Sequence, residues 1–222
     1  MLFLADLDRP KVRSFMLDEI DLDIKTNVLY ISKRFSSVGI RDYPDLIRQA
    51  AQQFDDEWLS NELRKKFRIN ITEQRRFRTA TIPSNAPEII AEGEFNRFYI
   101  RGLCRFALEN RISELEVYVA KTVETPRPDS VSIIGTRINA NDLLNDLRTS
   151  IGIVPTLGVP AGPNSEISVK LPEDIQIKRS WIVRIFGQRR VKWLTRLFGQ
   201  TQTKPMYSRI WSMVKNIFKF RQ

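Results

Sequence analysis

Two neighbouring segments near the start of the chain have apolar residues at helical spacing. The first is predicted to begin at Tyr43–Pro44, with Asp42 as the N-cap and the proline in the first turn. The second is predicted to run from Asp55–Asp56 to Lys65–Lys66. Its acidic residues then lie at the positive end of the helix dipole and its basic residues at the negative end. Together these segments predict a helical hairpin.

Two later segments also predict helices. Residues 84–110 form the longer pattern, which opens with a cap residue and a proline in the first turn and contains Gly93 as a point where the helix could break. Residues 139–151 form the shorter pattern, which begins at Asn139 or Asn141 and ends before a glycine.

Short alternating stretches of apolar and polar residues predict four strands. They span residues 28–31, 114–120, 131–138 and 167–171. Because helices are predicted between and around them, the first 174 residues are expected to form an α+β body with a small mixed sheet flanked by helices. Apolar residues make up 42% of the chain, which is sufficient for a packed core.

Residues 175–222 are predicted to form a separate helical extension. The pattern Trp-x-x-Arg-Ile-Phe-Gly-Gln at residues 181–188 recurs at residues 193–200 with leucine in place of isoleucine, and residues 210–218 vary it. In each segment the aromatic and aliphatic residues share one side of a helix and the basic residues lie off that side. The residues expected to contact a membrane or a partner are Trp181, Arg184, Ile185, Phe186, Arg189, Arg190, Lys192, Trp193, Arg196, Leu197, Phe198, Trp211, Val214, Lys215 and Phe218.

The positive charge of the chain is concentrated in this extension. It contains twelve of the 36 basic residues and none of the 26 acidic residues. The first 174 residues, with 24 basic and 26 acidic side chains, therefore have a net charge of −2. The basic composition thus points to anionic partners of the extension, lipid or nucleic acid, and not of the body as a whole.

The rarity of two residue types excludes several kinds of site. No histidine is present, which excludes Ser-His-Asp triads, histidine-ligated metals and imidazole bases. Cys104 is the single cysteine, so no intrachain disulfide can form, and this suits a reducing compartment. No segment reaches the roughly 18 consecutive apolar residues of a membrane-spanning helix. The apolar start, Met1–Ala5, is too short for a cleaved signal. An intracellular protein, cytoplasmic or on the cytoplasmic face of a membrane, is expected.

Arginine residues form a stripe on the predicted helix at residues 84–110. Arg97, Arg101 and Arg105 recur every four residues and could bind phosphate or carboxylate groups in a bidentate manner. However, Glu94 precedes Arg97 by three residues and Glu109 follows Arg105 by four. A solvated face with intrahelical ion pairs is therefore favoured over an anion-binding surface.

A second basic cluster, residues 75–78, interleaves three arginines with Phe77. Such a cluster could contact phosphate groups. A strand whose arginine side chains point outward is the commoner structure for this pattern and is favoured here.

Four carboxylates lie within residues 18–23. A calcium loop would require a central glycine and a distal glutamate in register, and both are missing. A solvated edge or a helix start is therefore favoured, and no metal or other cofactor is predicted. As an enzymatic alternative, a metal-dependent phosphodiesterase would have to recruit Asp21, Asp23, Glu92 or Glu116, and the sequence gives no indication that these converge.

These patterns favour a non-enzymatic adaptor or structural subunit of an intracellular assembly. Its body would bind a protein partner or further copies of the chain, and its extension would hold it at an anionic membrane surface. Two alternatives stay open. One is nucleic-acid binding through the extension together with Arg97, Arg101 and Arg105. The other is docking of the extension on a partner protein.

Overall fold

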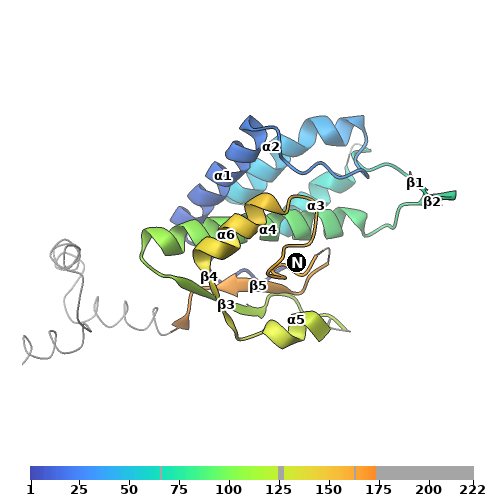
Figure 1. Ribbon diagram of the computed structural model, residues 1–222. Coiled ribbons are helices and arrows are strands. Elements are labelled where there is room, and N and C mark those ends of the chain that lie inside the picture. Colours follow the sequence, from blue (N-terminus) through green and yellow to red (C-terminus); the bar gives the residue numbers. More distant parts are fainter. Residues whose placement is uncertain (66, 125–127, 163, 174–222) are drawn as a thin grey trace, which may run out of the picture. The chain divides into compact units, whose positions relative to one another are not determined.

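One long helix, α4 (Ala86–Glu109), lies at the centre of the body (Figure 1). The structure is a computed structural model and describes residues 1–65, 67–124, 128–162 and 164–173. Every residue of α4 from Phe95 to Cys104 is buried, because helices cover one side of α4 and strands lie against the other. The helices in contact with it are α1 (Pro10–Lys25), α2 (Ser37–Gln53), α3 (Asp56–Arg64) and α6 (Ala140–Thr149).

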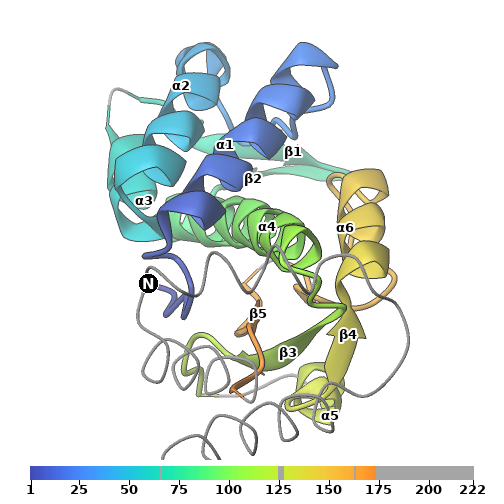
Figure 2. The same cartoon turned by 90° about the vertical axis from the view of Figure 1, so that its left-hand side faces the viewer.

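A three-stranded antiparallel sheet lies on the side of α4 opposite to α1 and α2 (Figure 2). Its central strand β3 (Glu114–Val119) pairs with β4 (Arg137–Asn139) on one edge and with β5 (Ile167–Lys170) on the other. Leu115 and Val117 of β3 are fully buried, whereas the strand ends are exposed. This alternation places one face of β3 in the core between the sheet and α4.

Two smaller elements complete the body. Strands β1 (Thr72–Arg75) and β2 (Arg78–Thr81) form an antiparallel hairpin with a two-residue turn. A short helix, α5 (Pro128–Ile133), precedes β4.

The α+β class predicted from the sequence is confirmed by these six helices and two small antiparallel sheets of the described residues. The expectation of one mixed sheet is wrong, because every strand pair in this part of the chain is antiparallel. The hairpin of β1 and β2 forms a sheet of its own.

The helical hairpin of α2 and α3 is confirmed, but α2 begins earlier than predicted. Ser36 is its N-cap, and the Ser36 hydroxyl accepts a hydrogen bond from the backbone N–H of Gly39 at 3.2 Å. Pro44 therefore lies inside the helix. Helix α3 starts at Asp55–Asp56, as predicted, and Asp55 is its N-cap, whose carboxylate accepts from the N–H of Trp58 at 2.9 Å.

Two predicted strands are wrong. Residues 28–31 form no strand, because the backbone N–H groups of Val28 and Leu29 donate to the Asp23 carbonyl at the end of α1. The segment 131–138 is instead divided between the end of α5 and the start of β4. The strands predicted near 114–120 and 167–171 are confirmed as β3 and β5.

The helices predicted over residues 84–110 and 139–151 are confirmed as α4 and α6. Helix α4 continues through Gly93 without a break. Helix α6 is capped by Asn139, whose side-chain oxygen accepts from the N–H groups of Asn141 and Asp142.

Candidate functional site

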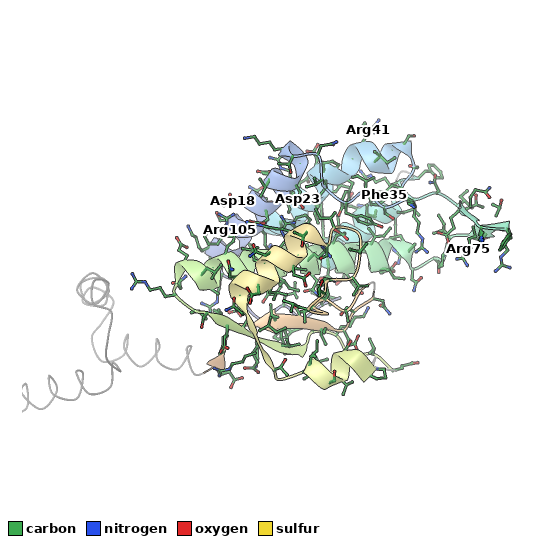
Figure 3. All side chains as sticks on the ribbon, viewed as in Figure 1. Asp18, Asp23, Phe35, Arg41, Arg75 and Arg105 are labelled. Atoms are coloured by element: carbon green, nitrogen blue, oxygen red, sulfur yellow. The ribbon has the colours of Figure 1, made fainter. Side chains whose placement is uncertain are left out.

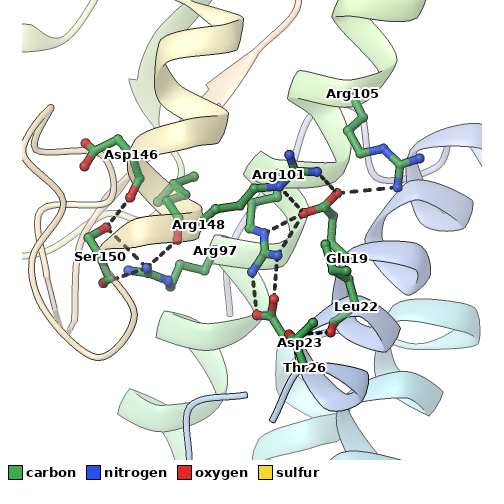
Figure 4. Close-up of polar contacts among 11 residues, drawn as sticks. Glu19, Leu22, Asp23, Thr26, Arg97, Arg101, Arg105, Asp146, Arg148 and Ser150 are labelled. Carbon is green, nitrogen blue, oxygen red and sulfur yellow. Dashed lines mark hydrogen bonds and ion pairs between the residues drawn. The ribbon is translucent and has the colours of Figure 1, made fainter. Parts of the chain in front are cut away.

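The arginine stripe of α4 lies between three helices and not on a solvated face (Figure 4). Arg101 is 1% exposed and makes a bidentate pair with Asp23 of α1, with nitrogen–oxygen distances of 2.6 and 2.8 Å. Its Nε atom also donates to Glu19 of α1 at 3.0 Å. Because both carboxylates are themselves buried, Arg101 supplies charge compensation that water cannot.

Glu19 joins the stripe to α6. Arg148 of α6 donates to both Glu19 oxygens, at 2.9 and 2.6 Å. Arg105 lies 3.4 Å from Glu19 and 3.1 Å from Asp18. Burial by itself would raise the pKa of Glu19, but the hydrogen bonds and charges of Arg148 and Arg101 outweigh it and lower this pKa below its ordinary value. Three guanidinium groups thus balance three carboxylates between α1, α4 and α6, and we call these six residues the arginine–carboxylate cluster.

Arg97 lies one turn away and binds backbone instead of carboxylates. Its guanidinium group donates to the carbonyl oxygens of Leu147 and Ser150 at 2.8 Å each, at the end of α6. These are carbonyl groups that the end of a helix leaves without intrahelical partners. Burial lowers the pKa of Arg97, although the nearby Glu94 carboxyl raises it.

The predicted solvated face with intrahelical pairs is therefore corrected. The carboxylates that Arg101 and Arg105 contact come from α1. The guanidinium groups of Arg97 and Arg101 are engaged by acceptors of the protein itself, so these two arginines join helices, whereas Arg105 stays partly exposed.

The carboxylates proposed for a metal-dependent enzyme are each held by a different basic group. Asp21 pairs with Arg48 and Asp23 with Arg101, while Glu92 pairs with Lys121 and Glu116 with Lys170. No group of three or more carboxylate or thiol side chains in the described ranges is arranged to hold a metal ion. The acidic run at residues 18–23 lies within α1, with Glu19 and Asp23 facing inward, and not at a solvated edge or a helix start.

A pocket of about 620 Å³ opens beside the first half of α4. Apolar side chains from α4 and from the loop after α6 line it together with Lys33, Arg34 and Glu94. This volume falls in the range of small-molecule sites, and the mixed lining could accept a ligand with both apolar and charged parts. Glu73 and Arg97 also line this pocket.

Glu94 is the unusual acid of this pocket. Glu73 is engaged by Arg34 at 2.8 Å, whereas Glu94 has no hydrogen-bond partner among the described residues. Burial raises the pKa of Glu94 to about 7, although the charge of Arg97 opposes this shift. Among the described residues, the buried Tyr43 hydroxyl also has no hydrogen-bond partner. Burial raises the pKa of Tyr43, and the charge of Glu94 adds to this effect. Glu94 can therefore exchange a proton near neutral pH.

From the sequence, Glu94 was expected only to pair with Arg97 within the helix, and Arg148 was not identified as a partner of the acidic residues. The spacing of Glu19 and Asp23 by four residues, which matches the spacing of Arg101 and Arg105, is the signal that could have paired α1 with α4.

Every residue expected to contact a membrane or a partner, from Trp181 to Phe218, lies outside the described residues. In the part that is described, none of the helices combines the length and the apolar character that spanning a bilayer requires.

Comparison of the chain with protein-family models, with curated proteins and with solved structures finds no match.

Proposed function

We propose that the chain is a non-enzymatic adaptor or structural subunit whose C-terminal extension holds it at an anionic membrane surface. One observation carries this proposal. Residues 175–222 combine twelve basic residues and no acidic residue with a repeated Trp/Phe pattern. Tryptophan and phenylalanine favour the headgroup boundary of a bilayer, and lysine and arginine favour anionic lipids.

The expected binding free energy is sufficient for such a role. Each basic residue near an anionic surface contributes about 1 kcal/mol, and each buried aromatic or aliphatic side chain contributes ~1–2 kcal/mol. If half of the basic residues and a few aromatic ones take part, the total exceeds the cost of ordering short helices. No covalent lipid is required.

The geometry of the body favours lipid over nucleic acid. Nucleic-acid binding would draw on Arg97, Arg101 and Arg105 beside the extension, but Arg97 and Arg101 are buried and bonded within the protein. A body of net charge −2 then contributes little to attraction of a polyanion.

Co-flotation with vesicles tests the proposal. The full chain is compared with the chain shortened after Ile177, on vesicles of neutral lipid and on vesicles of increasing anionic content. We expect the full chain to float with anionic vesicles and the shortened chain to stay in the soluble fraction. Equal flotation of the two would reject the membrane role. Tight, steeply salt-dependent binding of DNA or RNA that the same truncation abolishes would favour nucleic acid instead.

A further inference from the structure

The three most exposed large apolar side chains of the described residues occur within one stretch of sequence, the hairpin of β1 and β2 and the loop that leads to it. They are Phe77, Phe67 and Ile71, which are 88%, 87% and 77% exposed. Phe77 occupies the two-residue turn between Arg75 and Arg78. Figure 1 shows this hairpin extending outward from the helices. Phe67 and Ile71 lie at or before the base of the hairpin, where the Phe67 carbonyl accepts from the Ser36 hydroxyl and the Ile71 carbonyl accepts from the N–H of Ile82. Phe77 is therefore the apolar side chain that the hairpin carries at its tip.

The tip also carries basic groups that are free to bind. The guanidinium group of Arg76 lies 5.1 Å from the centre of the Phe77 ring. Arg75 is paired with Glu73 at 2.7 Å. In the described ranges, neither Arg76 nor Arg78 has a carboxylate partner, so both can bind an external anion. The tip therefore presents one phenyl ring between two available cations.

The base of the hairpin is fixed to the body. Arg34 pairs with Glu73 of β1 at 2.8 Å, and the N–H of Asn70 donates to the Arg34 carbonyl at 2.9 Å. Strands of four residues carry the tip roughly 13 Å beyond this base. In Figure 3, Arg75 lies at the outer end of the hairpin, far from Asp18 and Arg105 of the arginine–carboxylate cluster. The projection is thus a positioned element and not a loose loop.

We propose that this tip, residues 75–78, is a second membrane-contact element that inserts Phe77 at the headgroup boundary while Arg76 and Arg78 bind anionic headgroups. The inference rests on the proposed membrane function and assigns part of it to the body. A phenyl ring between cations matches a surface in which apolar chains lie beneath anionic oxygens.

Two other kinds of partner fit the tip less well. Arg76 already lies over the ring of Phe77, which reduces the free ring surface that stacking on a nucleic-acid base would need. A turn of two residues on a narrow hairpin offers far less area than the roughly 1,200 Å² that a stable protein interface buries.

Titration of the full chain with vesicles tests the proposal. The vesicles contain phosphatidylcholine with or without about 30% phosphatidylserine. Phe77→Ser is expected to weaken binding to the anionic vesicles about tenfold, since the phenyl group no longer enters the apolar boundary. Phe3→Ser is the matched control, because Phe3 is 72% exposed but is followed by no arginine within five residues. Its binding is expected to be unchanged.

The charged half of the tip is tested separately. Arg76→Gln combined with Arg78→Gln is expected to weaken binding to the anionic vesicles about thirtyfold and to leave binding to neutral vesicles unchanged. Thermal unfolding midpoints equal to that of the natural protein confirm that these exposed substitutions leave the fold intact.

The results separate this inference from the proposed function. If Phe77→Ser binds vesicles as tightly as Phe3→Ser, the hairpin tip is no membrane contact, whether or not truncation after Ile177 abolishes binding. If Phe77→Ser weakens binding while truncation has no effect, the tip is retained and the extension is rejected as the anchor. If the full chain binds neither kind of vesicle, both are rejected. A loss of DNA or RNA binding in Phe77→Ser, with vesicle binding unchanged, reassigns the tip to nucleic acid.

Discussion

Arg101 fixes the register in which α4 packs against α1. Its fork geometry satisfies Asp23 with two hydrogen bonds and Glu19 with one. A buried ion pair need not stabilise a fold more than apolar side chains would, but removing one partner leaves an uncompensated buried charge. The cluster therefore specifies how the helices meet.

Replacement of Arg101 is expected to destabilise the body strongly. Arg101→Met leaves Glu19 and Asp23 buried without their central cation, which costs about 3–5 kcal/mol of unfolding free energy in urea denaturation. Arg105→Gln is the control, because Arg105 is partly exposed and its loss costs about 1 kcal/mol or less. Equal effects of the two substitutions would contradict the central place of Arg101.

The raised pKa of Glu94 predicts a pH dependence of stability with a definite sign. Its folded-state pKa is raised from the ordinary value of 4.5 to about 7, so the folded protein holds this proton more tightly than the unfolded chain does. The stability that the protonated Glu94 carboxyl contributes is fully present below about pH 4.5, and it is lost as the pH rises to about 7.

Substitution of Glu94 by glutamine should remove this loss. We expect the unfolding free energy of Glu94→Gln, relative to the natural protein, to be larger by about 3 kcal/mol near pH 8 than near pH 4. Denaturation at the two pH values measures it. A difference that does not change with pH would show that Glu94 ionises normally.

The sequence identified the stripe residues but not their environment. Spacing along one helix places Arg97, Arg101 and Arg105 on one side, yet it cannot say which element covers that side. The acidic partners of Arg101 lie on α1, about 80 residues earlier in the sequence. Glu19 and its second partner, Arg148, are 129 residues apart. Such pairs depend on tertiary packing, which intrahelical spacing does not determine.

At the scale of elements, local capping chemistry located the start of some helices and not of others. Asn139, one of the two predicted caps, caps α6, and Asp55, predicted only as an acidic residue at the helix start, caps α3; each side chain accepts hydrogen bonds from backbone N–H groups of the first turn. Ser36 does the same for α2 but was passed over in favour of Asp42, whose carboxylate instead pairs with Arg68 and Arg41.

The β1–β2 hairpin was not predicted as a hairpin because its turn lacks the usual signal. Two-residue turns commonly contain asparagine or glycine, whereas this one contains Arg76 and Phe77. The predicted outward-pointing arginines at residues 75–78 are nevertheless confirmed, since Arg75, Arg76 and Arg78 are all exposed.

Two glycines of α4 should respond in opposite ways to alanine. A Cβ atom at Gly102 would lie 2.7 Å from Met16 Cγ and 2.9 Å from the Val12 carbonyl oxygen, so α1 would have to move. We expect Gly102→Ala to lower the unfolding free energy by about 1–3 kcal/mol. At Gly93 a Cβ atom meets nothing within 4 Å. Gly93→Ala should therefore raise stability by up to about 1 kcal/mol, because glycine disfavours helix.

Urea denaturation of the two variants measures this contrast. If Gly93→Ala destabilised the protein as much as Gly102→Ala, the close contact of α1 with α4 would not be the reason for glycine at position 102.

At the scale of the whole molecule, the hydrophobic pattern predicted the fold class but not the topology. The alternation of helix and strand patterns sufficed for an α+β body. The order β4–β3–β5 joins segments separated by a helix and a long loop, and its antiparallel pairing leaves no local trace in the sequence. The charge division between residues 1–174 and 175–222, by contrast, follows from the sequence alone.

That division leads to the central claim, that the extension by itself confers membrane attachment. Residues 175–222 fused to an unrelated soluble protein provide the most direct measurement, by flotation with vesicles of neutral and of anionic lipid. The account predicts that the fusion floats with anionic vesicles and that added salt weakens this binding. A fusion protein that stays in the soluble fraction with both kinds of vesicle would contradict it.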